Sequence, residues 1–375
     1  MLETLDQQGV YLGRVWLDAV DGSAVVTIRD GMVLDITCRE APTVRDICEL
    51  ADPAGYVRSA SGAVICAVSE LATRDDVTLL APCDLQAIKA CGVTFAESMV
   101  ERVIEERAAG DPAKATELRA RIGAEIGASL SDVVPGSEKA ALAKQALIRE
   151  GLWSQYLEVG IGPYAEVFTK AQPMSAVGSG AVVGIHPESR WNNPEPEIVL
   201  TVSSAGRIVG AALGNDVNLR DFEGLSALLL GKAKDNNASC AIGPMIRLFD
   251  DSFDLDDIRE AELDLTVTGT DGYVLTGHSS MRKISRDPSD LVAQTIGRHH
   301  QYPDGFMLFL GTLFAPVKDR GEKGMGFTHH LGDTVEIANA RLGVLKNVVN
   351  HSTECPQWTF GVSHLMRNLA RRGLI

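Results

Sequence analysis

The run Pro194-Glu195-Pro196-Glu197-Ile198-Val199-Leu200-Thr201-Val202 joins two glutamates to an apolar, β-branched tail. The tail is typical of a strand, and alternate residues of a strand project from one face, so we expect Glu195 and Glu197 to lie side by side. Two adjacent carboxylates repel each other unless a cation lies between them. A surface strand can also carry two glutamates without a ligand, so a metal site requires a further ligand from elsewhere.

Asp216 supplies the third carboxylate. A second strand is predicted over Arg207–Leu213, after a Ser204-Ala205-Gly206 turn, and the hairpin Ile198–Leu213 would return Asp216 to the two glutamates. Three carboxylates without His or Cys suit Mg²⁺, or alternatively Mn²⁺; Ca²⁺ would also fit, and zinc is disfavoured. We therefore predict a metal site formed by Glu195, Glu197 and Asp216.

Motifs from about Leu80 to Val349 resemble those of the fumarylacetoacetate hydrolase family. Their order along the chain is far more specific than any one of them. They are Glu195-x-Glu197, Asn215-Asp216-x-x-x-Arg220-Asp221, Lys234 ahead of Cys240-Ala241-Ile242-Gly243-Pro244, Gly311-Thr312, Leu331-Gly332-Asp333-x-Val335-Glu336, Gly343-x-Leu345-x-Asn347, and upstream Glu166-Val167-Phe168-x-Lys170 and Ser175-Ala176-Val177.

The resemblance implies a mixed β-roll whose three carboxylates hold a metal, with 2-oxo or 1,3-dicarbonyl acids reacting through a metal-bound enolate. It also implies that Arg220 and Lys234 stabilise charge or transfer protons beside the metal. Thr312 would hold the substrate carboxylate, and Lys170 and Arg220 would contact the substrate.

Plainer interpretations of the same residues stay open. Arg220 could pair with Asp221 or Glu223, Lys234 could be surface charge next to Lys232, and Thr312 could be an ordinary strand residue.

The chain departs from the hydrolytic members of this family at Ser98. Those members carry a His-x-x-Glu pair that activates water, whereas here Ser98 stands at the histidine position and Glu101 remains. Losing such a base lowers a hydrolysis rate by roughly 10²–10⁴ unless it is replaced. The sequence is similar to the branch that dehydrates 2-dehydro-3-deoxy-pentonates to 2,5-dioxopentanoate, which shares the helical insert and the segment from His299 to Pro303.

In this elimination the C3 proton and the C4 hydroxyl leave as water. Lys234 or Glu101 would remove the C3 proton, and Glu101 or a water held by Ser98 would protonate the departing hydroxyl. The alternative enzyme is a hydrolase that cleaves a carbon–carbon bond of 2,4-dioxo acids. A third possibility is a relative that binds a small acid without turnover.

The sequence predicts an α+β protein: a β-rich N-terminal domain over residues 1–88, then a metal-dependent catalytic domain over 89–375. Short β-branched runs and Asp-Gly turns fill the first part. A charge-rich helical insert occupies about 97–156, with helices at Lys114–Ile126 and from the N-cap Ser137 to Tyr156. This insert would be a solvated layer or a lid over the site.

Composition limits the partners. A net charge of −15 repels phosphate backbones and argues against nucleic acid. The beginning of the chain lacks a signal pattern and the longest apolar run, Phe306 to Val317, is too short to span a bilayer, so we expect a cytoplasmic protein without membrane contact. Seven widely spaced cysteines indicate reduced, mostly buried thiols. The family resemblance implies a small 2-oxo acid substrate and a homodimer or homotetramer.

Overall fold

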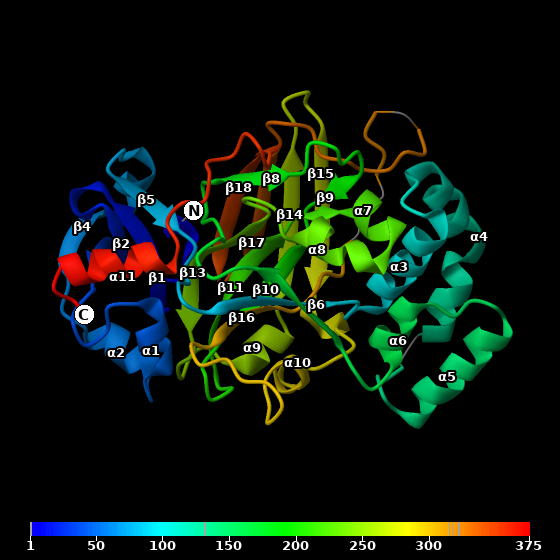
Figure 1. The fold of residues 1–375 in the computed structure, drawn as a ribbon, viewed down its shortest axis with the longest axis horizontal. Helices are drawn as coiled ribbons and strands as arrows, with labels where there is room; N and C mark the ends of the chain where they lie inside the picture. Colours follow the sequence, from blue (N-terminus) through cyan, green and yellow to red (C-terminus); the bar gives the residue numbers. More distant parts are fainter. Residues whose placement is uncertain (1, 131–132, 315, 317, 322) are drawn as a thin grey trace.

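The computed structural model describes residues 2–130, 133–314, 316, 318–321 and 323–375. Over these residues the chain has the mixed α+β fold that the sequence predicts, with sheets at the centre and helices gathered mainly at one end (Figure 1). The strands are β1 Tyr11–Leu17, β2 Gly22–Arg29, β3 Met32–Asp35, β4 Ala63–Ala67, β5 Val77–Leu80, β6 Ala87–Gly92, β7 Glu166–Ala171, β8 Val182–Ile185, β9 Asn192–Asn193, β10 Pro196–Val202, β11 Ile208–Asp216, β12 Asn218–Leu219, β13 Cys240–Leu248, β14 Glu262–Thr268, β15 Val274–Ser280, β16 Phe306–Phe309, β17 Thr334–Asn339 and β18 Gly343–His351.

The α-helices divide into a group near the N-terminus, the insert and a few later helices. They are α1 Val44–Glu49, α2 Pro53–Ser59, α3 Ala96–Ala108, α4 Pro112–Leu130, α5 Glu138–Arg149, α6 Gln155–Ile161, α7 Arg220–Leu225, α8 Leu230–Lys234, α9 Leu255–Arg259, α10 Pro288–Thr295 and α11 Val362–Arg371.

The large sheet has the order β4-β3-β2-β1-β13-β11-β10-β16-β6-β7 in the described residues, with β5 added to β1. The predicted hairpin forms its centre, and every residue of β10 is buried. A strand that is covered on both faces has a continuous run of apolar residues, whereas a strand with one solvated face alternates apolar and polar residues. The apolar run Ile198–Leu200 therefore indicated a buried strand in the sequence. The hairpin is therefore held rigidly between neighbouring strands on both sides.

A second sheet, with the order β15-β14-β17-β18-β8, covers one face of the large sheet. In β14 the residues alternate between exposed and buried, as expected for a strand with one solvated face. Its buried Leu263, Leu265 and Val267 join one hydrophobic core with Ile198 and Leu200 of β10. This core fixes the hairpin against the second sheet.

The N-terminal strands and their Asp-Gly turns are confirmed, but two short helices, α1 and α2, were not predicted. Strand β1 pairs with β13 through Tyr11 and Arg247, so the N-terminal strands continue directly into the large sheet. Helix α11 returns to this region, where Asn368 donates to the carbonyls of Val20 and Asp21. The domain boundary between residues 88 and 89 stays a prediction.

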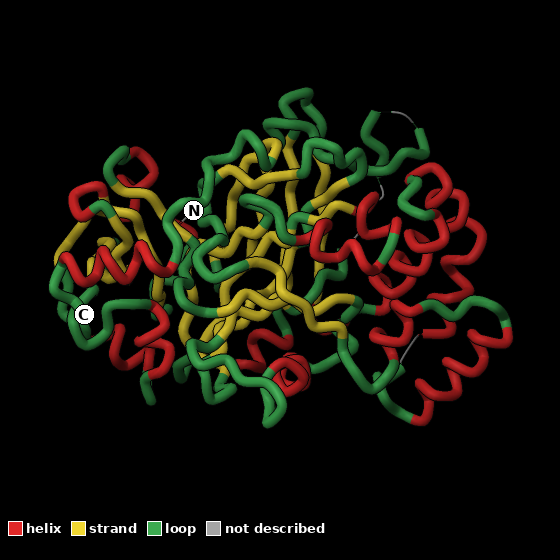
Figure 2. Tube along the Cα trace, in the orientation of Figure 1, coloured by secondary structure: helices red, strands yellow, loops and turns green. Residues whose placement is uncertain are grey.

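The insert forms a cluster of helices beside one end of the sheets (Figure 2). Ser137 caps α5 as predicted, accepting a hydrogen bond from the Ala140 N–H. The single helix predicted from Ser137 to Tyr156 is wrong. Its first part ends at Arg149, the chain turns at Gly151 with φ +69°, and Ser154 then caps α6. A left-handed residue ends a helix, and glycine adopts that conformation without a steric penalty.

All seven cysteines are free, and six of them are buried, which confirms the interpretation of their spacing. Among the described residues, no helix has the length and apolar character needed to cross a bilayer.

Candidate metal and active site

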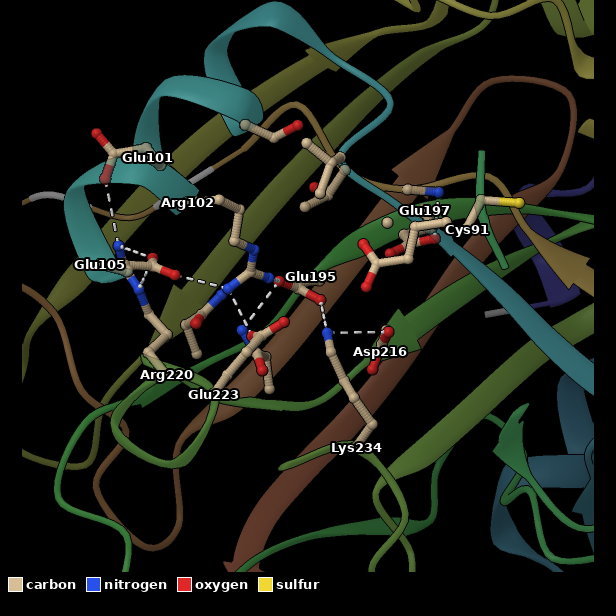
Figure 3. A pocket seen from close by; sticks show the side chains of 18 of the residues that line it. Cys91, Glu101, Arg102, Glu105, Glu195, Glu197, Asp216, Arg220, Glu223 and Lys234 are labelled. Atoms are coloured by element: carbon tan, nitrogen blue, oxygen red, sulfur yellow. Dashed lines mark hydrogen bonds and ion pairs between the residues drawn. The ribbon is translucent and has the colours of Figure 1, made fainter. Parts of the chain in front are cut away.

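The β10–β11 hairpin brings three carboxylates together, as the sequence predicts. Glu197 lies opposite Gly214 in the antiparallel register, and the Asp216 N–H donates to the Glu195 carbonyl oxygen at 3.0 Å. One oxygen from each of Glu195, Glu197 and Asp216 lies within 4.8 Å of the others, and all three side chains are buried. Figure 3 shows these carboxylates facing one another across the site.

Cationic side chains surround two of the three carboxylates. The Lys234 ammonium donates to Glu195 and, at 3.1 Å, to Asp216, so it lies between them (Figure 3). The other oxygen of Glu195 accepts hydrogen bonds from Arg102 and from the Asn218 amide, both at 3.1 Å. Lys234 is therefore not the surface charge that its neighbour Lys232 suggested.

Glu197 has a different environment, because its hydrogen-bond donor is the Gly311 N–H at 2.7 Å. Gly311 has φ +90°, and a Cβ added there would lie 2.1 Å from Thr94 Oγ1. Only glycine satisfies both the backbone conformation and this close approach. The Gly311-Thr312 motif thus positions a backbone donor on Glu197.

The donor set fits a hard divalent cation. Burial, followed by the charges of Asp216 and Glu195, raises the pKa of Glu197 well above its ordinary value. Burial also raises the pKa of Asp216, but Lys170 and Lys234 outweigh it and hold that pKa below the ordinary value. Three converging buried carboxylate oxygens, without His or Cys, are the ligands that Mg²⁺ and Mn²⁺ prefer.

Helix α3 of the insert supplies residues to the same cavity, and these include Ser98 and Glu101. The Ser98 hydroxyl donates to the Phe95 carbonyl at 2.8 Å and accepts from the Phe95 N–H, so it stabilises the first turn of α3. Glu101 accepts two hydrogen bonds from Arg119, at 2.7 and 2.6 Å, and lies 3.3 Å from Arg220. Both residues line the cavity, but Glu101 is held as an ion-pair partner.

Arg220 pairs with neither of the neighbours considered from the sequence. Its guanidinium lies 2.5 Å from Glu105 and stacks on Trp191, with 4.3 Å to the ring centroid. Glu223 instead pairs with Arg102 at 2.5 Å. Burial tends to raise the pKa of Glu105, but Arg220 and Arg102 together hold it below its ordinary value.

Lys170 and Thr312, both predicted to bind substrate, lie in different places. Lys170 is fully buried and absent from the cavity wall; its ammonium lies 2.9 Å from Asp216 and donates to the carbonyl of Lys234. Lys170 thus supports Asp216, and its contact with the substrate stays a prediction that this position does not favour. Thr312 lines the cavity, where its hydroxyl accepts from the Phe314 N–H at 3.1 Å.

Sequence reasoning gave no role to several cavity residues. Glu166 is the most informative, because burial followed by the charge of Glu223 raises its pKa to about 7. A signal existed: Glu166, Phe168 and Lys170 alternate along β7 and so share one face of that strand. Other lining residues with polar or ionisable side chains that had no assigned role are Cys91, Arg102, Glu105, Asn193, Asn218 and Glu223.

The cavity measures about 40 Å³ and, among its described lining residues, contains no histidine. His299 and His300, which precede β16, are exposed and do not line it. Among the described lining residues, therefore, no other histidine takes the place of the one that Ser98 replaces.

We predict that Lys170→Met lowers the free energy of unfolding by roughly 3–5 kcal/mol, because it leaves Asp216 with one buried cation fewer. Urea unfolding in EDTA measures this. Lys346→Met is the matched control: Lys346 forms a solvent-exposed pair with Glu336, worth at most about 1 kcal/mol. Equal losses in the two variants would contradict the supporting role of Lys170.

The family model described as fumarylacetoacetate (FAA) hydrolase C-terminal matches residues 160–350, just over half of the chain. The chain belongs to the fumarylacetoacetate hydrolase family. This segment begins just before β7 and ends within β18, so it contains the hairpin with all three carboxylates.

Two curated relatives match part of the chain. One, "Probable 2-keto-3-deoxyxylonate dehydratase" of Haloferax volcanii, is 31% identical over 194 residues, 52% of this chain and 63% of that protein. The other, "2-dehydro-3-deoxy-D-arabinonate dehydratase" of Saccharolobus solfataricus, is 30% identical over 180 residues, 48% of this chain and 57% of that protein. The matches thus span about 60% of each relative's length.

A solved structure, "2-keto-3-deoxy-D-arabinonate dehydratase complexed with magnesium and 2,5-dioxopentanoate", matches with a TM-score of 0.63 and 20% identity. The match covers 91% of this chain and 99% of that one. It shows that the two chains share the family fold over nearly their whole length.

Proposed function

We propose that this protein is a magnesium-dependent dehydratase that converts a 2-dehydro-3-deoxy-pentonate into 2,5-dioxopentanoate. The observation that carries the proposal is a buried triad of carboxylates in a cavity whose described lining offers no histidine to activate water. The names of both curated relatives, and the magnesium and product in the solved structure, support the same reaction.

Glu195, Glu197 and Asp216 would hold the metal, with Mn²⁺ as an alternative to Mg²⁺. When bound, the metal supplies Lewis acidity that stabilises negative charge on the C1 carboxylate and C2 oxygen of a 2-oxo acid. Lys234 adds a fixed positive charge at the same end, because its ammonium lies between Glu195 and Asp216. Thr312, which lines the cavity, would contact the substrate carboxylate.

We assign the proton transfer to Glu166 instead of Glu101. Glu101 accepts hydrogen bonds from Arg119 and Arg220, so both of its oxygens are already engaged. Glu166 lines the cavity, and its pKa of about 7 lets it exist in both protonation states near neutral pH. Ionised Glu166 would take the C3 proton and then deliver it to the C4 hydroxyl.

This elimination balances without any co-reactant. The C3–H and C4–O bonds break, a C3–C4 double bond forms, and the proton leaves with the hydroxyl as water. The resulting 5-hydroxy-2-oxopent-3-enoate has the composition of 2,5-dioxopentanoate and reaches it by tautomerisation alone. The runner-up reaction, hydrolysis of a 2,4-dioxo acid, would need a group that activates water at the position of Ser98.

We expect the purified protein to dehydrate a racemic 2-oxo-3-deoxypentonate and to leave a 2,4-dioxo acid unchanged when both are supplied in parallel. EDTA should abolish the reaction, and added Mg²⁺ or Mn²⁺ should restore it, because the triad binds hard cations. Product formation can be followed by NMR. Release of pyruvate from the dioxo acid alone, or full activity in EDTA, would show the proposed function to be wrong.

A further inference from the structure

Two asparagines form a facing pair beside the carboxylate triad. Asn193 of β9 and Asn218 of β12 are direct partners in an antiparallel bridge, so their Cβ atoms lie close together. Both residues line the cavity, yet only 2% of Asn193 and 1% of Asn218 is exposed to solvent.

The orientation of each carboxamide is fixed by an acceptor. Asn193 Nδ2 donates to the Pro194 carbonyl at 2.9 Å, and Asn218 Nδ2 donates to the Glu195 carboxylate at 3.1 Å. Rotating either amide by half a turn would place its oxygen against another oxygen, so the assignment of N and O is determined by the surroundings. The remaining atom of each amide is therefore a carbonyl oxygen, which can only accept.

Neither oxygen has a donor in the part of the chain that the structure describes. Buried amide oxygens are nearly always hydrogen-bonded, because leaving one without a donor is unfavourable. Two such oxygens on one cavity wall form a site whose complement is a pair of hydrogen-bond donors. A polar ligand that carries two hydroxyl groups meets this requirement, whereas one that presents carbonyl oxygens does not.

We propose that Asn193 and Asn218 recognise the hydroxyl-bearing end of the substrate. The assignment rests on the proposed function, in which the C1 and C2 oxygens lie at the carboxylate triad. Asn218 Nδ2 contacts Glu195 directly, so we assign the oxygen of the same amide to the C4 hydroxyl. Asn193 then accepts from the C5 hydroxyl. The pair thus selects 2-oxo acids with a vicinal diol over dioxo acids, which offer acceptors at this end.

The test compares two ligands that lack the C4 hydroxyl and cannot undergo this elimination, 5-hydroxy-2-oxopentanoate and 2-oxopentanoate. Calorimetric titration in the presence of Mg²⁺ gives a dissociation constant for each. We expect the wild type to bind the hydroxylated acid at least about tenfold more tightly, since a site built for a hydroxyl disfavours the analogue without one.

In Asn193→Leu, which has similar bulk but no acceptor, we expect the two dissociation constants to become nearly equal. Most of this change should come from weaker binding of the hydroxylated acid. Asn237→Leu is the matched control, because Asn237 lies outside the cavity and is partly buried. It should keep the wild-type preference.

A wild type that binds both acids equally would overturn this inference even if Asn193→Leu did not fold. A preference that survives in Asn193→Leu would overturn it as well. Both results would leave the proposed dehydration standing, because that reaction is measured separately by product formation. Failure of both acids to bind would overturn the inference together with the placement of the substrate at the triad.

Discussion

Glu197→Gln should lower kcat/KM by about 10³ or more, one of the two largest effects expected of a single substitution. The change keeps the shape of the side chain and its acceptor for the Gly311 N–H, but it removes one of the three charges that would hold the metal. A metal that stabilises charge in the transition state contributes several kcal/mol, and each 1.4 kcal/mol corresponds to about tenfold in rate. Titration with Mn²⁺ should show a parallel loss of metal affinity.

The thermal stability of Glu197→Gln distinguishes a loss of metal binding from misfolding. Because burial and its two acidic neighbours raise the pKa of Glu197, the ionised form is unfavourable in the metal-free protein. A neutral glutamine avoids that repulsion, so the Tm of Glu197→Gln in EDTA should equal or exceed that of the wild type. Glu336→Gln, in β17 of the second sheet, serves as the control and should change neither activity nor metal affinity. Wild-type metal affinity in Glu197→Gln would exclude Glu197 as a ligand.

Glu166→Gln should lower kcat by roughly 10²–10⁴, the range typical of a lost general acid or base. In the wild type, proton removal needs the ionised form, which accumulates as pH rises through about 7. We therefore expect kcat to rise as pH passes through about 7 and to level off above it. This rise should be missing from the residual activity of Glu166→Gln. Rates measured from pH 5 to 9 with saturating Mg²⁺ provide the test.

The same pKa shift has a consequence for stability. The pKa of Glu166 rises from 4.5 to about 7 on folding, so its contribution to stability is complete below 4.5 and is lost as pH rises through about 7. Glu166→Gln removes this dependence. Glu158→Gln changes an exposed carboxylate of α6 and should leave the rate profile as it is. An unchanged kcat in Glu166→Gln would return the proton transfer to Lys234 or Glu101.

The carboxylate triad could be predicted because its geometry is local. One hairpin connects Glu197 to Asp216, and the register of a hairpin follows from its turn and its apolar pattern. The alternation of Glu166 and Lys170 along β7 was equally visible. What the sequence left open was how far along that face the cavity extends, which depends on the packing of β7 against α8.

The contacts of the insert could not be predicted in the same way. Arg102 bridges Glu105, Glu195 and Glu223, which belong to three separate segments. Its position depends on how α3 packs against α7, and helix periodicity in the sequence does not specify that packing. Arg220 shows the same limit, because its acidic neighbours in sequence turned out not to be its partners. A helical insert was predicted, but most contacts of the residues that it directs into the cavity were not.

The pairing of β1 with β13 has a consequence for how the protein is synthesised. Strand β1 leaves the ribosome more than 200 residues before Cys240–Leu248, its neighbour in the finished sheet. At about 5–20 residues per second, this gap lasts roughly 10–45 s. During this interval Tyr11 and Leu12 have no partner on the β13 side, although Arg14 to Leu17 can already pair with β5. Unpaired edges are prone to association with other chains. Slow translation or a shortage of chaperones should therefore lower the yield of this protein through the exposed part of β1.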